Sequence, residues 1–233
     1  MPCTLPASLA DAAVCRGSFH AVLGGEAGEA VFADFSAALQ KAQAEGRILT
    51  ASLFRYEIHL FFYAEGLNRP FTPQGLCPAL DAALLPWPPA LGEAAPRPWA
   101  AMQPYFYHDV PTTAADWQQG RCPQRRRGRI ALLPPDSWCS YMEHHLRIVT
   151  EGLVEGDRWH LICVQEGVLF SYLEEPRTNV NIKHQPGAHS PELDAWIAAD
   201  PESHFARFTP EQKAHPDSSH NFVFLPRIAG TED

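Results

Sequence analysis

Two side chains suited to proton transfer lie close together in the stretch that spans residues 132–153. Tyr141 and His145 are four positions apart, so a helix would place them only about 40° apart around its axis. An imidazole titrates near neutrality and can act as an acid and then as a base, while a neighbouring phenol can orient a ligand or relay a proton. The pair therefore indicates acid–base chemistry. The structural alternative is a core tyrosine and histidine whose polar atoms are satisfied by neighbours.

The element that must position this pair is a helix expected over about 136–154. Pro135 precedes Asp136, whose side chain suits an N-cap, and Gly156 is expected to close the helix. Apolar residues recur at helical spacing on the face that holds the pair. They are Trp138, Met142, Ile148, Val149 and Leu153. We therefore expect this face to point toward a sheet.

An internal repeat organises the rest of the chain. LFFYAE at 60–65 matches LFSYLE at 169–174, an offset of 109 residues. Each half reads as a strand, a helix, two consecutive strands, a long Pro-rich segment with a second helical stretch, and a last strand. That order is the ferredoxin-like split βαβ arrangement. We therefore predict an α+β fold of two tandem ferredoxin-like β-α-β-β-α-β repeats, packed sheet to sheet as an intrachain α+β barrel.

The repeat also sets the expected domain boundaries. These are an N-terminal tail at 1–16, a first repeat at 17–108, a linker at 109–128, a second repeat at 129–228 and a C-terminal tail at 229–233. A basic run closes the linker region, made of Arg125, Arg126, Arg127 and Arg129. We expect a solvated linker there, with a phosphate or partner site as the alternative.

The two halves differ at the positions that carry the chemistry. Where the second helix has Tyr141 and His145, the matching places of the first helix hold Phe32 and Ser36. A polar group in an apolar environment costs free energy unless it finds a partner. We therefore expect the second half to hold the better polar pocket.

Several residues of the second half follow the motif of one enzyme family. They are Pro135, Asp136, Tyr141, His145 and Glu151 at the family's spacings, the hairpin LFSYLE at 169–174, Trp196 as counterpart of a tryptophan in the second helix, and the aromatic strand NFVFL at 221–225. Over about 128–228 the chain therefore resembles the L-rhamnose mutarotase family. The first half resembles it only in element order and in LFFYAE.

This resemblance implies a mutarotase or epimerase that interconverts the anomers of a rhamnose-like monosaccharide without a metal or organic cofactor. It implies His145 as the catalytic acid and base and Tyr141 as its supporting residue. Trp196 would stack on a sugar face, with an ordinary core tryptophan as the alternative. Glu151 lies far round the helix from His145 and is a substrate-binding or capping candidate. Because the family's chains carry one repeat and pair as dimers, we expect a monomeric pseudo-dimer or a homodimer.

Composition limits the partners of the chain. The 233 residues are 45% hydrophobic and carry a net charge of −9, which argues against broad binding to nucleic acid or an anionic membrane. No apolar stretch approaches the roughly 20 residues needed to span a bilayer, and the N-terminus lacks the features of a signal peptide. The six cysteines form no CxxC pair. We therefore expect a cytoplasmic protein with reduced thiols.

Other chemistries have weaker support. Eleven histidines raise the question of a metal, but no HExxH motif or tight Cys/His cluster occurs, and we expect no metal site. The His-bearing loop at 179–191 is expected on the surface, where it could fold over a cleft. One alternative function is a haem-dependent enzyme of the tandem α+β-barrel type, with a helix histidine as axial ligand. The other is a small-molecule-binding module without catalysis.

Overall fold

The computed structural model describes residues 6–152, 154–177, 183–184, 189–213 and 215–231. Two compact units make up the chain. The first unit comprises Met1–Met102, Pro111–Pro123 and Pro226–Asp233, and the second comprises Gln103–Val110 and Gln124–Leu225. Most of the His-bearing loop at 179–191 lies outside the described residues.

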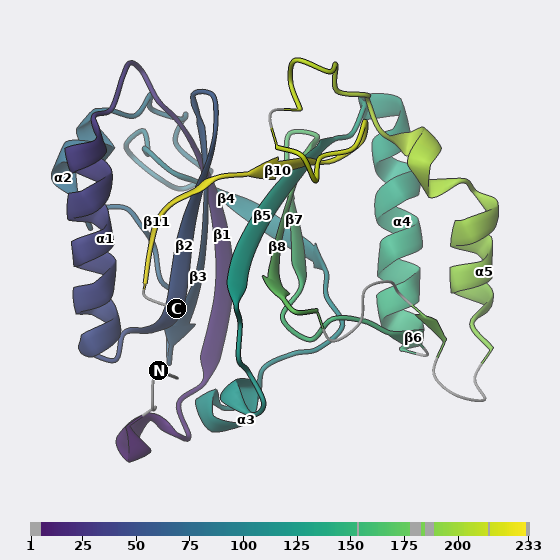
Figure 1. Cartoon of the computed structure of the whole chain (residues 1–233), viewed down its shortest axis with the longest axis horizontal. Helices are drawn as coiled ribbons and strands as arrows, with labels where there is room; N and C mark the ends of the chain where they lie inside the picture. The colour runs from purple at the N-terminus through teal and green to yellow at the C-terminus, as the bar shows by residue number, and fades with distance from the viewer. Residues whose placement is uncertain (1–5, 153, 178–182, 185–188, 214, 232–233) are drawn as a thin grey trace. The chain divides into compact units, whose positions relative to one another are not determined.

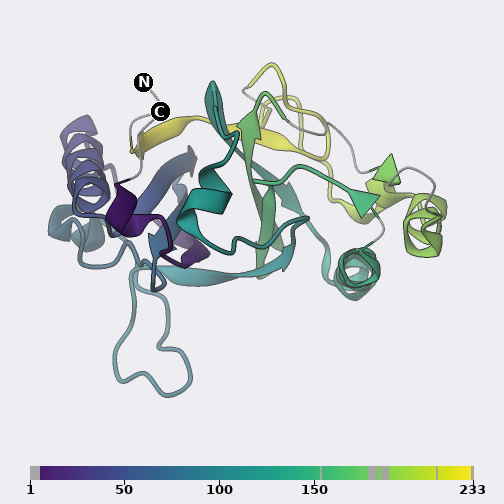
Figure 2. The ribbon, with the colours of Figure 1, turned by 90° about the horizontal axis from the view of Figure 1, so that it is seen from below.

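The first unit is a helix-covered antiparallel sheet with the strand order β4-β1-β3-β2-β11. Its strands are β1 (Val14–Val22), β2 (Ile48–Tyr56), β3 (His59–Leu67), the start of β4 (Ala100–Phe106) and β11 (Arg227–Gly230). Its helices are η1 (Ala7–Leu9), α1 (Glu29–Ala44), α2 (Pro78–Ala82) and α3 (Ala114–Gln118). Figure 1 shows α1 alongside this sheet, and the segment between α2 and β4 projects as a long loop in Figure 2. The buried face of α1 closes the core of this unit.

The second unit repeats this strand arrangement as β10-β5-β8-β7, followed by the end of β4. Its strands are β5 (Arg125–Leu132), β6 (Val154–Glu155), β7 (Leu161–Gln165), β8 (Val168–Glu175), β9 (Lys183–His184) and β10 (Val223–Leu225). Its helices are α4 (Pro135–Glu151), α5 (Pro191–Ala198) and η2 (Pro201–His204), and α5 lies beside α4 in Figures 1 and 2. In the described part of the chain, no helix has both the length and the apolar character needed to cross a membrane.

Local signals set the hairpins of both units. The turn between β7 and β8 places Glu166 at φ 51° and Gly167 at φ 78°, and the turn between β2 and β3 places Glu57 at φ 53°. Positive φ at both central residues, as in the β7–β8 turn, or at the first alone, as in the β2–β3 turn, matches the twist of antiparallel strands and allows a tight hairpin. The hairpin predicted around residues 165–167 is confirmed.

The predicted packing of the two halves is wrong. Residues 100–102 of β4 pair with β1, and residues 103–106 of the same strand pair with β7. Hydrogen bonding therefore runs through β4 and joins nine strands in one antiparallel sheet. Two tandem ferredoxin-like repeats that pack sheet to sheet as an intrachain α+β barrel would instead keep separate sheets. The repeat shows local element order, but the edge pairing of β4 is non-local and leaves no local trace.

Two further expectations need correction. Helix α4 ends at Glu151 and not near residue 154, because Gly152 takes the left-handed conformation at φ 68° and its N–H bonds to the carbonyl of Ile148. The basic run is also not a solvated linker. Arg126 lies within β5, and its side chain is only 8% exposed. Its Nε is 3.6 Å from the carboxylate of Glu174.

Candidate active site in the second unit

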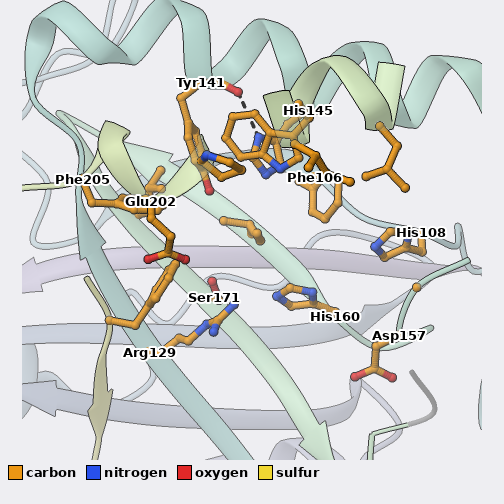
Figure 3. Close-up of a pocket in the computed structure, with 18 of the residues that line it drawn as sticks. Phe106, His108, Arg129, Tyr141, His145, Asp157, His160, Ser171, Glu202 and Phe205 are labelled. Carbon is orange, nitrogen blue, oxygen red and sulfur yellow. Dashed lines mark hydrogen bonds between the residues drawn. The ribbon is translucent and has the colours of Figure 1, made fainter. Parts of the chain in front are cut away.

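A cavity of about 350 Å³ lies between the helices and the sheet of the second unit. This volume is at the small end of the range for small-molecule sites. In Figure 3, Tyr141 and His145 face the cavity from α4, while Arg129 and Ser171 face it from the strands opposite. One wall is therefore aromatic and the other is polar.

Helix α4 directs His145 into this cavity. The helix starts with Pro135 at its first turn, and the residues buried on it, Tyr141, His145 and Ile148, share the face that points to the sheet. The Nδ1 of His145 lies 2.9 Å from the backbone carbonyl oxygen of Tyr141. A carbonyl can only accept, so Nδ1 carries the proton and donates it. The Nε2 of the neutral ring is therefore a proton acceptor.

The surroundings of His145 keep its ring neutral. Its ring centroid lies 4.2 Å from that of Tyr141, 4.6 Å from that of Phe106 and 4.7 Å from that of Trp196. Burial among these rings lowers the pKa of His145 to about 4, although the bond to the Tyr141 carbonyl acts in the opposite direction. The imidazole is therefore uncharged at neutral pH and can serve as a base or as a hydrogen-bond acceptor.

Tyr141 is a neutral phenol in the same wall. Burial raises its pKa to about 12, and its ring meets that of Tyr105 edge-on with centroids 6.2 Å apart. At physiological pH the hydroxyl therefore keeps its proton. It can donate a hydrogen bond but cannot act as a base.

Arg129 brings a positive charge to the opposite wall. It pairs with Ser171 across β5 and β8, and its guanidinium carbon lies 4.3 Å from the ring centroid of Phe222. Burial lowers the pKa of Arg129 to about 10, so the side chain still carries its charge at neutral pH. The cavity therefore combines an uncharged base and a cation on facing walls.

A second polar group lines the cavity next to β7. The carboxylate of Asp157 is buried and lies 3.5 Å from Nε of Arg177. His108 packs against Gly156 so closely that a Cβ at that glycine would overlap the imidazole. Burial lowers the pKa of His108 to about 4, although Asp157 acts in the opposite direction. His160 lines the same end of the cavity (Figure 3).

Three of the four residues singled out from the sequence meet here. Tyr141, His145 and Trp196 all line the cavity, which lies in the second half as expected. Glu151 does not line it: its carboxylate accepts a hydrogen bond from the hydroxyl of Ser190, the N-cap residue of α5. Their roles toward a ligand remain predictions.

The first unit has core residues at the positions where the second unit has cavity residues. Strand registers and the 109-residue helix offset give the matches. The second unit has Arg129, Tyr141, His145, Ser171 and Phe222, and the first unit has Phe19, Phe32, Ser36, Phe62 and Trp99. The four aromatic residues of the first unit, Phe19, Phe32, Phe62 and Trp99, pack in or against the hydrophobic core of that unit. The fold itself therefore requires neither a charge nor an imidazole at these positions.

Sequence reasoning missed Arg129, Ser171, Phe106 and His108 as cavity residues. For Ser171 a signal was available in the repeat, because the 109-residue offset aligns it with Phe62. Arg129 aligns with Phe19 only through the strand register, which the sequence does not show. No comparable signal marks Phe106 or His108, which reach the cavity from the end of β4 and the residues after it.

Comparisons with known proteins identify no family. No protein-family model matches the chain, and no curated protein is found similar to it. A candidate monooxygenase from Lactobacillus acidophilus is similar in structure at 6% identity and a TM-score of 0.38, with 94% of this chain and 96% of that chain covered. A candidate monooxygenase from Fusobacterium nucleatum shows 7% identity, a TM-score of 0.39 and coverage of 94% of both chains. An anthrone oxidase-like protein shows 7% identity and a TM-score of 0.36, covering 94% and 92%.

The identification with the L-rhamnose mutarotase family is therefore wrong. No family model matches the chain, and its strands are joined in one nine-stranded antiparallel sheet where two separate ferredoxin-like sheets were expected. The assignment to isomerases of carbohydrate metabolism is withdrawn with it. The spacing of Tyr141 and His145 has a simpler cause, since residues four apart on any helix stack on one face, as these two rings do.

Proposed function

We propose that the second unit is an enzyme that removes a proton from a small, flat and mostly apolar molecule. His145 is its general base. The observation that carries this proposal is the Nε2 acceptor of a neutral imidazole in a cavity, fixed by the bond from Nδ1 to the Tyr141 carbonyl. Phe106 and Trp196 both pack edge-on against the imidazole and supply apolar aromatic surface beside the base.

Proton transfer in this cavity suits a ligand that becomes an anion. The proton leaves an acidic O–H or an activated C–H of the ligand and bonds to Nε2 of His145, which leaves a negative charge on the ligand. Burial lowers the pKa of the empty ring to about 4, but an adjacent anion favours the imidazolium and offsets this effect. Tyr141 donates a hydrogen bond from its neutral phenol.

Elimination of 5-nitrobenzisoxazole tests the base directly. A base takes the proton from carbon, the C–H electron pair completes a nitrile, and the N–O bond breaks to give a coloured phenolate. We expect the protein to accelerate this reaction and His145→Ala to lower the rate by about 10²–10⁴. His220→Ala is the matched control, because His220 is exposed and lies outside the cavity. Binding without turnover would refute the catalytic proposal and leave a binding module.

A second candidate function is a haem-dependent oxidation. The fit rests on the same residue, since a ligating imidazole ordinarily donates its other ring N–H to a carbonyl or carboxylate, as His145 does to Tyr141. Haem, when bound, supplies one-electron and dioxygen chemistry. Titration with haem should then give a Soret band that His145→Ala shifts or removes. Absence of such a band, together with oxygen-independent elimination, favours the general-base enzyme.

A further inference from the structure

Arg129 differs from every other arginine of its strand. Arg125, Arg126 and Arg127 lie 3.7, 3.6 and 2.9 Å from the carboxylates of Glu175, Glu174 and Glu175. Arg129 makes no ion pair or hydrogen bond with any residue that the structure describes, and its Nε is buried. A partly buried charge without a partner is costly. Among the residues that the structure describes, this guanidinium has no polar partner.

The other charges around the cavity are already engaged with protein groups. Arg177 faces Asp157 at 3.5 Å. Glu202 also lines the cavity and acts electrostatically on Arg129, and it accepts a hydrogen bond from the side-chain amide of Asn221. Glu202 lies beyond ion-pair distance of Arg129. Among the described residues that line the cavity, Arg129 is therefore the cation available to a ligand.

The fold holds Arg129 in place without neutralising it. The guanidinium packs against Phe222, with 4.3 Å between its carbon and the ring centroid, and a cation over an aromatic face keeps its full charge. Its neighbour by register is Ser171, whose hydroxyl faces the same cavity (Figure 3). In the first unit the matching pair is Phe19 and Phe62, with ring centroids 6.3 Å apart. The matching position in the first unit therefore packs well with an uncharged aromatic residue, and the charge of Arg129 is not needed for packing.

From this arrangement we infer that Arg129 and Ser171 form an anion subsite, and that the ligand is an aromatic acid or phenol whose oxygen carries a negative charge in the complex. This inference rests on the proposed function and specifies its substrate class. The aromatic part of the ligand lies against the wall that holds Phe106 and Trp196, and its negative oxygen lies at Arg129. An anion that forms by proton transfer to His145 would be stabilised at the same place.

The test compares two ligands of one shape. Calorimetry measures the binding of 2-naphthoate, an anion, and of 2-naphthamide, its neutral counterpart. We expect the wild-type protein to bind 2-naphthoate about 10- to 100-fold more tightly, as for a hydrogen bond to a charged group. Arg129→Gln should abolish this preference and leave the affinity for 2-naphthamide unchanged, whereas Arg129→Lys should keep part of it.

The control and the outcomes separate this inference from the proposed function. Arg125→Gln removes an exposed arginine of the same strand and should leave the preference intact. If both compounds bind equally to the wild-type protein, the anion subsite is refuted and the aromatic cavity stands. If neither binds, the aromatic ligand class itself is wrong, and the subsite fails with it. A preference that persists in Arg129→Gln would assign the anion to another group.

Discussion

The neutral state of His145 makes a quantitative prediction about stability. Burial lowers its pKa from 6.5 to about 4 in the folded protein, whereas the unfolded chain keeps the ordinary value. As the pH falls through 6.5, the unfolded state therefore takes up a proton that the folded state refuses. The contribution of the neutral His145 to the free energy of unfolding is fully present above about pH 6.5. It is lost progressively as the pH falls toward about 4.

The size of the effect follows from the width of that window. One pKa unit corresponds to about 1.4 kcal/mol, so His145 should lower the free energy of unfolding by about 2.5 kcal/mol between about pH 7.5 and about pH 4.5. Replacement by glutamine removes the titrating group while keeping a side chain that can bond to the Tyr141 carbonyl. His145→Gln should therefore lack this share of the pH dependence.

Urea denaturation at a series of pH values measures the effect. The difference in the free energy of unfolding between wild type and His145→Gln isolates His145, because every other titrating group, His108 included, is common to both proteins. His220→Gln is the control and should show the pH dependence of the wild type. A difference that stays constant from about pH 7.5 to about pH 4.5 would show that His145 is solvated and has the same pKa in the folded and unfolded states. A change of opposite sign would show that it has an acidic partner.

Four further substitutions test two arginines, Arg129 and Arg121, and the aromatic wall of the cavity. Arg129→Met should raise the free energy of unfolding by about 1–2 kcal/mol, because it removes a partly buried charge that has no polar partner among the described residues. Arg121→Met should instead lower it by about 3–5 kcal/mol, because Arg121 holds the buried carboxylate of Glu65 at 2.7 Å; equal effects in urea denaturation would contradict the distinction. Tyr141→Phe should slow the elimination by less than His145→Ala, since only the hydroxyl is lost; a loss as large would make the phenol essential. Trp196→Ala should weaken 2-naphthoate and 2-naphthamide by the same factor in calorimetry, and a charge-dependent effect would contradict its role as an apolar wall.

The elements that could be predicted are those with local causes. The turn at Glu166 and Gly167 requires positive φ, and the apolar period that contains Tyr141 fixes one face of α4. The end of α4 was misplaced because Gly152 and Gly156 both suit a C-cap, and only the folded backbone shows which one takes the left-handed conformation. The pairing of β4 along two different strands was out of reach, because no short-range pattern encodes an edge partner.

The site shows the same division between local and non-local information. Tyr141 and His145 could be found because four-residue spacing on a helix is local. Arg129 could not be separated from Arg127, two residues earlier in the same basic run, because strand register alone decides that one faces Glu175 and the other faces a cavity. The mistaken family arose from the same limit, since a helical spacing constrains one face and says nothing of the opposite wall.

The two units of the chain serve as each other's reference. At matched positions of β1 and β5, the first unit packs Phe19 into its core and the second exposes Arg129 to a cavity. Hydrophobic packing alone would favour the first solution in both units, because a buried aromatic ring stabilises and a buried unpaired cation does not. Residues that break a local rule with no compensating contact inside the protein are expected where a function requires them. The second unit departs from apolar packing at two positions on facing walls of the cavity. One holds an imidazole that burial keeps neutral, and the other holds a guanidinium without a polar partner among the described residues. A ligand that gives its proton to one wall and places the resulting negative charge on the other would satisfy both groups at once.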